Sequence, residues 1–371
     1  MRRVLLDFGA IKSGGGVQLA LNFFEELSNV NIDEFEFHVL RPEIGPLAKE
    51  PLSIVVSEFI LPANPAKRFL FEILYLPHII KKLKIDVIYT FFGAGLPHSS
   101  AVKSVVGVAY PIICYPDSDY WTYVPYIQGV KKRLINSLRR RRLFQATQVI
   151  AETEVMRQRL IEYVGLDEKL ITVMAPSPTE YVTHQVRTPN QGPCADFVFL
   201  FLSGASPHKN LWRLPQVAKC LLYKGFCNFK FFVTTSRSAL LGHNVINDRD
   251  ILDRHFCFLE SVHPKEIDAL YGKCDVLVNL SDMESFSNNY MEAWKAGVPL
   301  LVSDRDFAKH ICGLSAIYVE PHDCEDVADK MINIAQNENL RHSLIIEGER
   351  LYKNLPSLYN RVQEILSLLR N

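Results

Sequence analysis

The chain has 371 residues, 48% of them hydrophobic and 22% charged, which is ordinary for a globular protein and favours two domains over one core. Its 41 Lys and Arg balance 41 Asp and Glu, so net charge identifies no class of partner. The eight cysteines are scattered without a C-x-x-C pair, which indicates reduced thiols, and no apolar run is long enough to span a membrane.

The first predicted elements are a strand, Val4 to Phe8, and an amphipathic helix, Val17 to Leu27. Asp7 cuts the N-terminal apolar run too short for a signal peptide. Between the two elements lie consecutive glycines, among them Gly15 and Gly16. A turn of this kind is the usual place for a nucleotide phosphate, although a plain tight turn explains it as well, since the full G-x-G-x-x-G spacing is missing.

Short apolar runs and helical stretches alternate through the rest of the first half. The runs lie at residues 35–40, 54–59, 87–89, 104–108 and 148–151, and the helical stretches at 66–82 and 152–163. Strands that alternate with helices predict an α/β fold with a largely parallel, doubly wound sheet.

Residues 110–145 combine aromatic residues with a run of positive charge. The segment that contains Tyr110, Asp117 and Asp119 fits a surface loop that lines a pocket. Basic residues then cluster beside apolar positions at helical spacing: Lys131, Lys132, Arg133, Arg139, Arg140, Arg141 and Arg142. A solvated helix face explains this cluster, and so does contact with anionic lipid headgroups or a diphosphate-bearing acceptor. Nucleic acid is the weakest alternative, because no recognition pattern accompanies the charge.

Pro, Thr and Gln dominate residues 176–193, which predicts a linker, after which the alternation of strands and helices restarts. The first loop of the second half contains Gly204, Ser206 and Lys209 between a strand and a helix. A lysine here can direct its ammonium at a diphosphate, although an exposed lysine at a helix start is the plainer alternative.

The most informative stretch is SDMESFSNNYMEAWKAGVPLLV, from Ser281 to Val302. Glu284 precedes a loop that includes Ser287, Asn288 and Asn289, and Glu292 is expected on the first turn of the helix that follows. Gly297 and Pro299 predict the end of that helix. A loop of small residues that opens a helix between two strands is where α/β sheets hold anionic ligands. Compensation of the helix dipole would explain Glu292 alone, but not the whole arrangement.

This stretch resembles the Glu-x7-Glu signature of retaining, nucleotide-sugar-dependent glycosyltransferases of the GT-B fold, particularly family 4. The resemblance implies two Rossmann-like doubly wound domains that face each other across a cleft. The expected parts are an acceptor domain over 1–176, a linker over 177–195, a sugar-donor domain over 196–355 and a terminal helix over 356–371 that packs back on the first domain.

The resemblance also implies roles for single residues. Glu292 would accept hydrogen bonds from ribose hydroxyls, and Glu284 would hold hydroxyls of the transferred sugar. The backbone around Ser287, Asn288 and Asn289 would bind phosphate oxygens, and Lys209 would stabilise the departing nucleoside diphosphate. Gly15, Gly16, Gly204 and Ser206 are expected at the nucleotide-sugar, and Tyr110, Asp117 and Asp119 at the acceptor. The scheme requires no metal and no cofactor.

Two positions depart from the family pattern. Ala205 stands where an arginine is usual, for which Arg237, His208 or Arg305 are candidate substitutes, and the first half lacks a histidine that many relatives carry after residues 104–108.

From the resemblance as a whole we expect a cytoplasmic glycosyltransferase, with peripheral contact at the inner face of the plasma membrane. Its acceptor would be a saccharide or a polyprenyl-linked glycan of a surface polysaccharide such as O-antigen. A sugar-nucleotide epimerase of the same fold, or a non-catalytic homologue that binds a nucleotide or a partner, remain alternatives.

Overall fold

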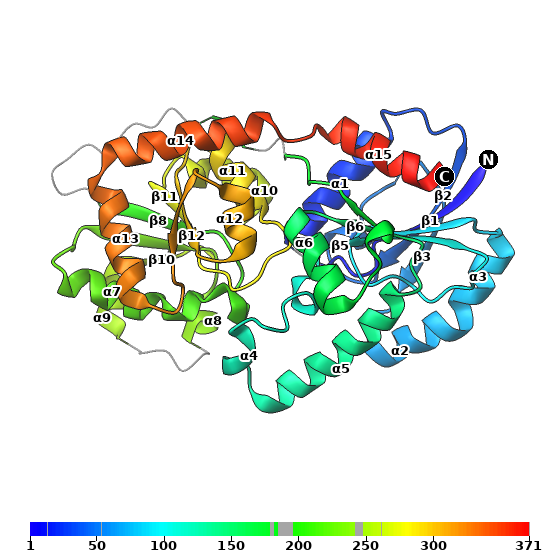
Figure 1. The fold of residues 1–371 in the computed structure, drawn as a ribbon, viewed down its shortest axis with the longest axis horizontal. Helices are drawn as coiled ribbons and strands as arrows, with labels where there is room; N and C mark the ends of the chain where they lie inside the picture. Colours follow the sequence, from blue (N-terminus) through cyan, green and yellow to red (C-terminus); the bar gives the residue numbers. More distant parts are fainter. Residues whose placement is uncertain are drawn as a thin grey trace. The chain divides into compact units, whose positions relative to one another are not determined.

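The computed structural model (Figure 1) describes residues 1–371 except 13, 53, 179–181, 185–195, 242–247, 261 and 371. It divides into two compact units. Unit 1 comprises Met1–Asp117, Pro125–Ser177 and Pro356–Asn371, and unit 2 comprises Ser118–Val124 and Pro178–Leu355. Most of the expected linker 177–195 lies outside the described residues. Among the described residues, no helix is long and apolar enough to cross a membrane.

Unit 1 is built on a parallel sheet of seven strands in the order β3-β2-β1-β4-β5-β6-β7. The strands are β1 (Arg2–Asp7), β2 (Phe35–Pro42), β3 (Val55–Leu61), β4 (Val87–Thr90), β5 (Lys103–Val108), β6 (Gln148–Ala151) and β7 (Ile171–Val173). The apolar runs of the sequence form the first six. The inner strands β4 to β6 are largely apolar, because a parallel sheet covered on both faces selects Val, Ile and Leu, whereas β3 at the sheet edge alternates half-buried and exposed residues. The three-residue β7 was not predicted, since so short a strand carries no periodic signal.

The helices of unit 1 are α1 (Gly15–Leu27), α2 (Pro65–Leu70), α3 (Leu76–Leu83), α5 (Tyr126–Leu143), α6 (Glu154–Arg159) and α15 (Leu358–Arg370). A π-helix over Phe71–Tyr75 joins α2 to α3, and another over Leu160–Val164 extends α6. Pro77, in the first turn of α3, does not end the helix, because the π-turn before it takes up the irregularity. Three short 3-10 helices cover Pro46–Ala48, Pro111–Ile113 and Glu168–Leu170.

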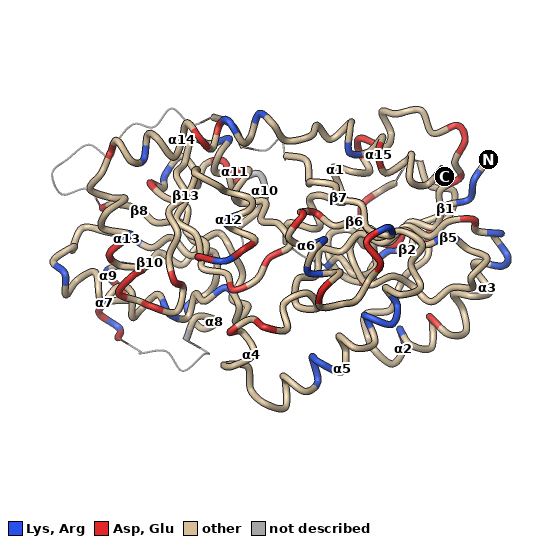
Figure 2. The backbone as a smooth tube through the Cα atoms, in the orientation of Figure 1, with Lys and Arg blue, Asp and Glu red and all other residues tan. Residues whose placement is uncertain are grey.

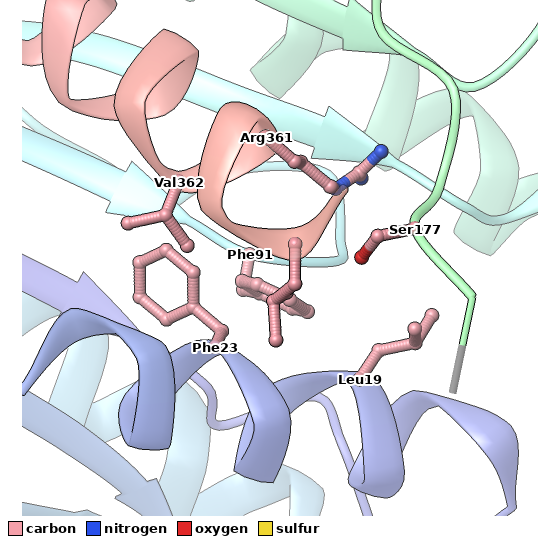
Figure 3. A pocket seen from close by; sticks show the side chains of 7 residues that line it. Leu19, Phe23, Phe91, Ser177, Arg361 and Val362 are labelled. Carbon is pink, nitrogen blue, oxygen red and sulfur yellow. The ribbon is translucent and has the colours of Figure 1, made fainter. Parts of the chain in front are cut away.

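The C-terminal helix α15 packs against α1 within unit 1. Figure 3 shows the small pocket at this junction, where Phe23 of α1 and Val362 of α15 approach Phe91. At its rim the buried Arg361 donates hydrogen bonds to the backbone carbonyls of Met174, at 2.9 Å, and Ala175. The end of the chain is therefore part of the core of unit 1.

Unit 2 contains a second parallel sheet, in the order β10-β9-β8-β11-β12-β13. Its strands are β8 (Phe197–Phe201), β9 (Phe229–Val233), β10 (Phe256–Phe258), β11 (Val276–Asn279), β12 (Leu300–Ser303) and β13 (Ala316–Val319). Its helices are α4 (Tyr120–Tyr123), α7 (Leu214–Tyr223), α8 (Arg237–Leu241), α9 (Arg249–His255), α10 (Pro264–Tyr271), α11 (Asn288–Ala296), α12 (Asp306–Cys312), α13 (Cys324–Gln336) and α14 (Glu338–Lys353). Buried phenylalanines of β8 and β9, Phe199, Phe201, Phe229 and Phe231, form the centre of its core.

Helix α11 is held in place at its C-terminal part. Gly297 ends it in the left-handed conformation, with φ 71°, as the sequence predicts. Trp294 of α11 packs against Gly348 of α14, where a Cβ would lie 2.5 Å from the indole ring. Only glycine permits this approach, so α14 fixes the helix that carries Glu292.

Candidate functional site

In unit 2 the loops after β8 and β11 leave the same edge of the sheet. β8 and β11 are neighbours, and the chain proceeds outward from β8 to β9 and β10 on one side, and from β11 to β12 and β13 on the other. Such a reversal of strand order is where open α/β sheets bind ligands. The loop after β8 carries Gly204 and Ser206, and the loop after β11 carries Glu284 and Ser287.

Lys209 and Glu284 meet at this edge of the sheet. Lys209 ends a 3-10 helix over Pro207–Lys209, and its ammonium forms an ion pair with the carboxylate of the buried Glu284. Ser281 donates a second hydrogen bond to the same carboxylate, at 2.8 Å. Burial alone would raise the pKa of Glu284, but the charges of Lys209 and His208 and these hydrogen bonds outweigh it and lower the pKa. Glu284 is therefore held as an anion beside a cation.

The pKa of Glu292 is shifted in the opposite direction to that of Glu284. It is the fifth residue of α11, in the second turn rather than the first as predicted, so compensation of the helix dipole does not explain it. Tyr271 donates a hydrogen bond to its carboxylate at 3.1 Å. Removal from water raises the pKa of Glu292 to about 7, which the hydrogen bond from Tyr271 only partly opposes. Glu292 is thus near the midpoint of its titration at neutral pH.

The N-terminus of α11 lies beside the loop after β8. Ser287 is the N-cap residue of α11, and its hydroxyl accepts a hydrogen bond from Asn279 at 3.2 Å. The side chain of Asn289 donates to the carbonyl of Leu202 at 2.5 Å, which ties the helix start to the end of β8. The side chain of Asn289 is therefore engaged, whereas the helix N-terminus at Asn288 offers a positive dipole to an anion.

Asp282, which the sequence analysis did not single out, joins four segments of unit 2. Its buried carboxylate accepts hydrogen bonds from Tyr123 of α4 and from His322 Nε2, the latter at 2.7 Å, and lies 3.9 Å from Arg305. Its backbone N–H donates to the carbonyl of His208, the neighbour of Lys209, at 2.8 Å. Asp282 thus positions the loop that carries Lys209. A lone aspartate after a strand gave no signal of this role in the sequence.

Residues 118–124 belong to unit 2, although the chain on either side belongs to unit 1. The ring of Tyr123 packs against Trp212 and His322, each with ring centres 5.9 Å apart, and Tyr120 packs against His208. The expected first domain is continuous over 1–176, whereas in the structure residues 118–124 belong to unit 2. Aromatic packing onto distant parts of the chain cannot be deduced from local pattern.

The three residues expected at the acceptor each contact an arginine of their own unit. In unit 1, Tyr110 lies under the guanidinium of Arg139 and Asp117 pairs with Arg159 at 2.9 Å. In unit 2, Asp119 approaches Arg305 at 3.3 Å. A role for these residues at the acceptor stays a prediction.

In unit 1, the glycine turn follows β1 as predicted. Gly15 and Gly16 are the first residues of α1. β1 and β4 are neighbours at the point where the strand order of the first sheet reverses, so this turn occupies the same topological position as the Lys209 loop does in unit 2.

The basic cluster lies on α5, where Figure 2 shows Lys and Arg along the helix. Three of its arginines make contacts within unit 1. Arg142 pairs with the buried Glu72 at 2.5 Å, Arg140 donates to the carbonyl of Val164 at 3.1 Å, and Arg139 covers Tyr110. Lys131, Arg133 and Arg141 lie at exposed positions and Lys132 at a half-buried one. The cluster is thus partly structural, and its contact with an anionic ligand stays a prediction.

Of the candidate substitutes for the missing arginine, His208 lies nearest the Lys209–Glu284 pair, where its charge helps to lower the pKa of Glu284. Arg237 pairs with Asp253 at 2.5 Å, and Arg305 pairs with Glu320 at 2.8 Å.

One group of described residues has the composition of a metal site. Ligand atoms of Asp119, Glu320 and His322 lie within 4.8 Å of one another. Arg305 pairs with both carboxylates, so a guanidinium already balances their charge. An ion would have to displace that guanidinium.

Comparison with protein-family models finds two matches. Residues 187–351 match the model described as glycosyl transferases group 1, and residues 13–176 match the model for glycosyltransferase family 4. The two ranges together contain Gly15 and Gly16 as well as Lys209, Glu284 and Glu292. Among curated proteins no match is found.

Solved structures match over nearly the whole chain. The match to a sucrose-phosphate synthase from Thermosynechococcus elongatus covers 100% of this chain and 98% of that protein, with a TM-score of 0.74 and 15% identity. The match to WaaG, a glycosyltransferase involved in lipopolysaccharide biosynthesis, covers 99% of both chains, with a TM-score of 0.74 and 12% identity. The Anabaena protein HepE in complex with UDP-glucose matches over 100% of both chains, with a TM-score of 0.70 and 14% identity. The predicted fold of two parallel Rossmann-like sheets is thereby confirmed as that of GT-B glycosyltransferases.

Proposed function

Since this chain is a glycosyltransferase of the group 1 type, we propose that it is a retaining enzyme that transfers a sugar from a nucleoside-diphosphate sugar to a saccharide or lipid-linked saccharide acceptor. The observation that carries the proposal is the placement of Lys209, Glu284 and the N-terminus of α11 at the reversal of strand order in unit 2. These groups provide, at one edge of one sheet, a cation, an anion and a helix dipole.

In this scheme the diphosphate binds at the N-terminus of α11 and beside Lys209, near Gly204 and Ser206. Glu292 accepts hydrogen bonds from the ribose hydroxyls, and Glu284 accepts them from hydroxyls of the transferred sugar. Lys209 is shared: its ammonium pairs with Glu284 in the free protein and approaches the phosphate when the substrate is bound. Gly15 and Gly16 are proposed as further contacts of the nucleotide-sugar.

The transfer step breaks the bond between the anomeric carbon and the phosphate oxygen. The acceptor hydroxyl forms the new bond on the same face, which retains the anomeric configuration, and its proton passes to the departing phosphate. Lys209 and the helix dipole stabilise the negative charge that develops on the diphosphate, so the scheme needs no metal ion. Activity that survives a chelator would support this part of the proposal.

Surface polysaccharide synthesis is proposed as the cellular role. WaaG is described as a lipopolysaccharide enzyme, and the basic helix α5 suits an acceptor that carries a diphosphate or is embedded among anionic lipids. We propose that the enzyme works at the inner face of the plasma membrane. Asp119, in unit 2 beside Arg305, remains a candidate for acceptor contact.

The experiment that tests the sugar-donor site is thermal-shift binding of UDP, GDP, dTDP and CDP to the wild type and to Glu292→Ala. UDP is the first choice, because HepE was solved with UDP and with UDP-glucose. A rise of the unfolding midpoint with one nucleotide that is lost in Glu292→Ala supports the proposal. Transfer from the matching sugar, followed by NMR of the product's anomeric proton, then tests retention.

A non-catalytic homologue is the second candidate, favoured by Ala205 in the place of a usual phosphate-binding arginine. It predicts nucleotide binding without turnover, or no binding at all. An epimerase predicts interconversion of the nucleotide-sugar without any acceptor, which the same NMR measurement detects.

A further inference from the structure

Helix α5 turns an apolar stripe toward solvent. Residues 130, 134 and 138 recur every four positions and therefore share one face. Leu134 and Leu138 are 65% and 60% exposed, and Tyr126 and Ile127 at the helix start are exposed as well. The opposite face carries the buried Asn136 and Leu143. A surface helix normally buries its apolar stripe, so this arrangement is reversed.

A second exposed apolar stretch lies on α2 and on the π-helix over Phe71–Tyr75. The exposed members are Phe69, Leu70, Ile73, Leu74 and Tyr75. Their neighbours Glu72 and Leu76 are buried and hold this segment on unit 1. The stretch is again apolar on the side that faces away from the core.

The two stretches are neighbours. Glu72 forms ion pairs with Arg68 of α2 at 2.8 Å and with Arg142 of α5 at 2.5 Å. Figure 1 shows α2 and α5 beside each other in unit 1, and the ion pairs place the C-terminal half of α5 against the π-helix. We call residues 65–84 and 126–143 together the α2–α5 surface.

Charge on this surface is almost entirely positive. Its basic residues are Lys67, Arg68, Lys81, Lys82 and Lys84 on the first segment and Lys131, Lys132, Arg133, Arg139, Arg140, Arg141 and Arg142 on the second. Its sequence contains one acidic residue, Glu72, which is buried and paired with Arg68 and Arg142. The exposed part therefore combines large apolar side chains with lysines and arginines.

We propose that the α2–α5 surface docks on a bilayer that contains anionic lipids. Its exposed apolar side chains enter the headgroup region, while its exposed basic side chains, such as Lys131, Arg133 and Arg141, bind lipid phosphates. A second copy of the chain is a poorer occupant, because a twofold contact would bring the same positive surface onto itself. The inference rests on the proposed function in that it explains how the enzyme reaches a lipid-linked acceptor, but nucleotide binding does not depend on it.

Insertion distinguishes this proposal from attraction by charge alone. Charge alone predicts that binding disappears at high salt and that apolar substitutions have no effect. Insertion predicts that the apolar and the basic side chains are both needed, since each group contributes to the affinity for the membrane.

The test is co-sedimentation of the full chain with vesicles of phosphatidylcholine alone or mixed equally with phosphatidylglycerol. The variants are the pairs Ile73→Ser with Leu74→Ser, Leu134→Ser with Leu138→Ser, and Lys131→Glu with Arg133→Glu. Each pair is expected to weaken binding to the mixed vesicles by about tenfold or more.

The control pair is Tyr223→Ser with Leu314→Ser, two unit 2 residues that are 91% and 78% exposed and do not belong to the surface. It is expected to bind vesicles like the wild type. All variants should keep the wild-type response to the nucleotide in the thermal-shift experiment, so failure here is separable from failure of the sugar-donor site.

Three results would overturn the proposal. They are no binding of the wild type to mixed vesicles, equal loss of binding in the control pair, and apolar variants that bind like the wild type. A change of oligomeric state in the Leu134→Ser and Leu138→Ser pair, seen by light scattering without a change in vesicle binding, would assign the surface to a second copy instead.

Discussion

Glu284 and Glu292 belong to one motif but have opposite electrostatics. Lys209 and Ser281 hold Glu284 as an anion. The carboxylate of Glu292 accepts a hydrogen bond from Tyr271 but loses solvation, so the pKa of Glu292 rises to about 7. A hydroxyl of ribose donates to the ionised form. Binding of the nucleotide should therefore require deprotonation of Glu292 and should lower its pKa.

Nucleotide affinity is accordingly expected to fall as the pH drops through 7. With a pKa of about 7, the dissociation constant at pH 6 should be about tenfold larger than at pH 8. Titration calorimetry over this range measures it. In Glu292→Gln the affinity should be weaker and nearly constant with pH, and an unchanged slope in that variant would assign the titration to another group.

Lys209 has two roles that substitutions can separate. Lys209→Ala leaves the buried Glu284 without its cation, which should lower the free energy of unfolding by ~2 kcal/mol, and removes positive charge at the leaving group, which should lower kcat about a hundredfold. The double variant Lys209→Ala with Glu284→Gln should regain stability without regaining turnover. Thermal unfolding and steady-state kinetics report the two effects, and recovery of both together would contradict the leaving-group role.

At the scale of elements, the short helix α4 is the least expected part of unit 2. Its Tyr123 donates a hydrogen bond to the carboxylate of the buried Asp282, and the backbone N–H of Asp282 donates to the carbonyl of His208. Tyr123→Phe leaves Asp282 with one partner fewer and should lower the free energy of unfolding by about 1–3 kcal/mol, as well as raise KM for the nucleotide-sugar.

Tyr223→Phe is the matched control, because this tyrosine lies exposed on α7 of the same unit. Chemical denaturation followed by intrinsic fluorescence compares the two variants. Equal stability of Tyr123→Phe and the control would show that the hydrogen bond to Asp282 contributes little.

At the scale of the whole molecule, the chain passes between the units at residues 117/118, 124/125, 177/178 and 355/356. The last passage matters for stability. Val362, Ile365, Leu366 and Leu369 of α15 are fully buried in unit 1. At ~1.5–3 kcal/mol for each buried side chain, their loss is comparable to the whole stability of about 5–15 kcal/mol that a domain has.

Deletion of residues 356–371 should therefore leave unit 1 unable to fold stably, while unit 2 keeps its own core. Circular dichroism during heating should show loss of the transition that belongs to unit 1. Tyr359→Ala, on the exposed face of α15, should unfold like the wild type. A deletion variant with an unchanged melting profile would contradict the assignment of α15 to this core.

Local pattern was sufficient for most of the fold. The inner strands β4, β6, β8, β11 and β12 are largely apolar runs, and Gly297 marks the end of α11, because burial and backbone conformation select residue types directly. The pairing of Lys209 with Glu284, the approach of Tyr123 to Asp282 and the solvent-facing stripe of α5 depend on residues far apart in the chain. Only the packed structure decides them, because the energy of a side chain depends on what surrounds it, which sequence spacing does not specify.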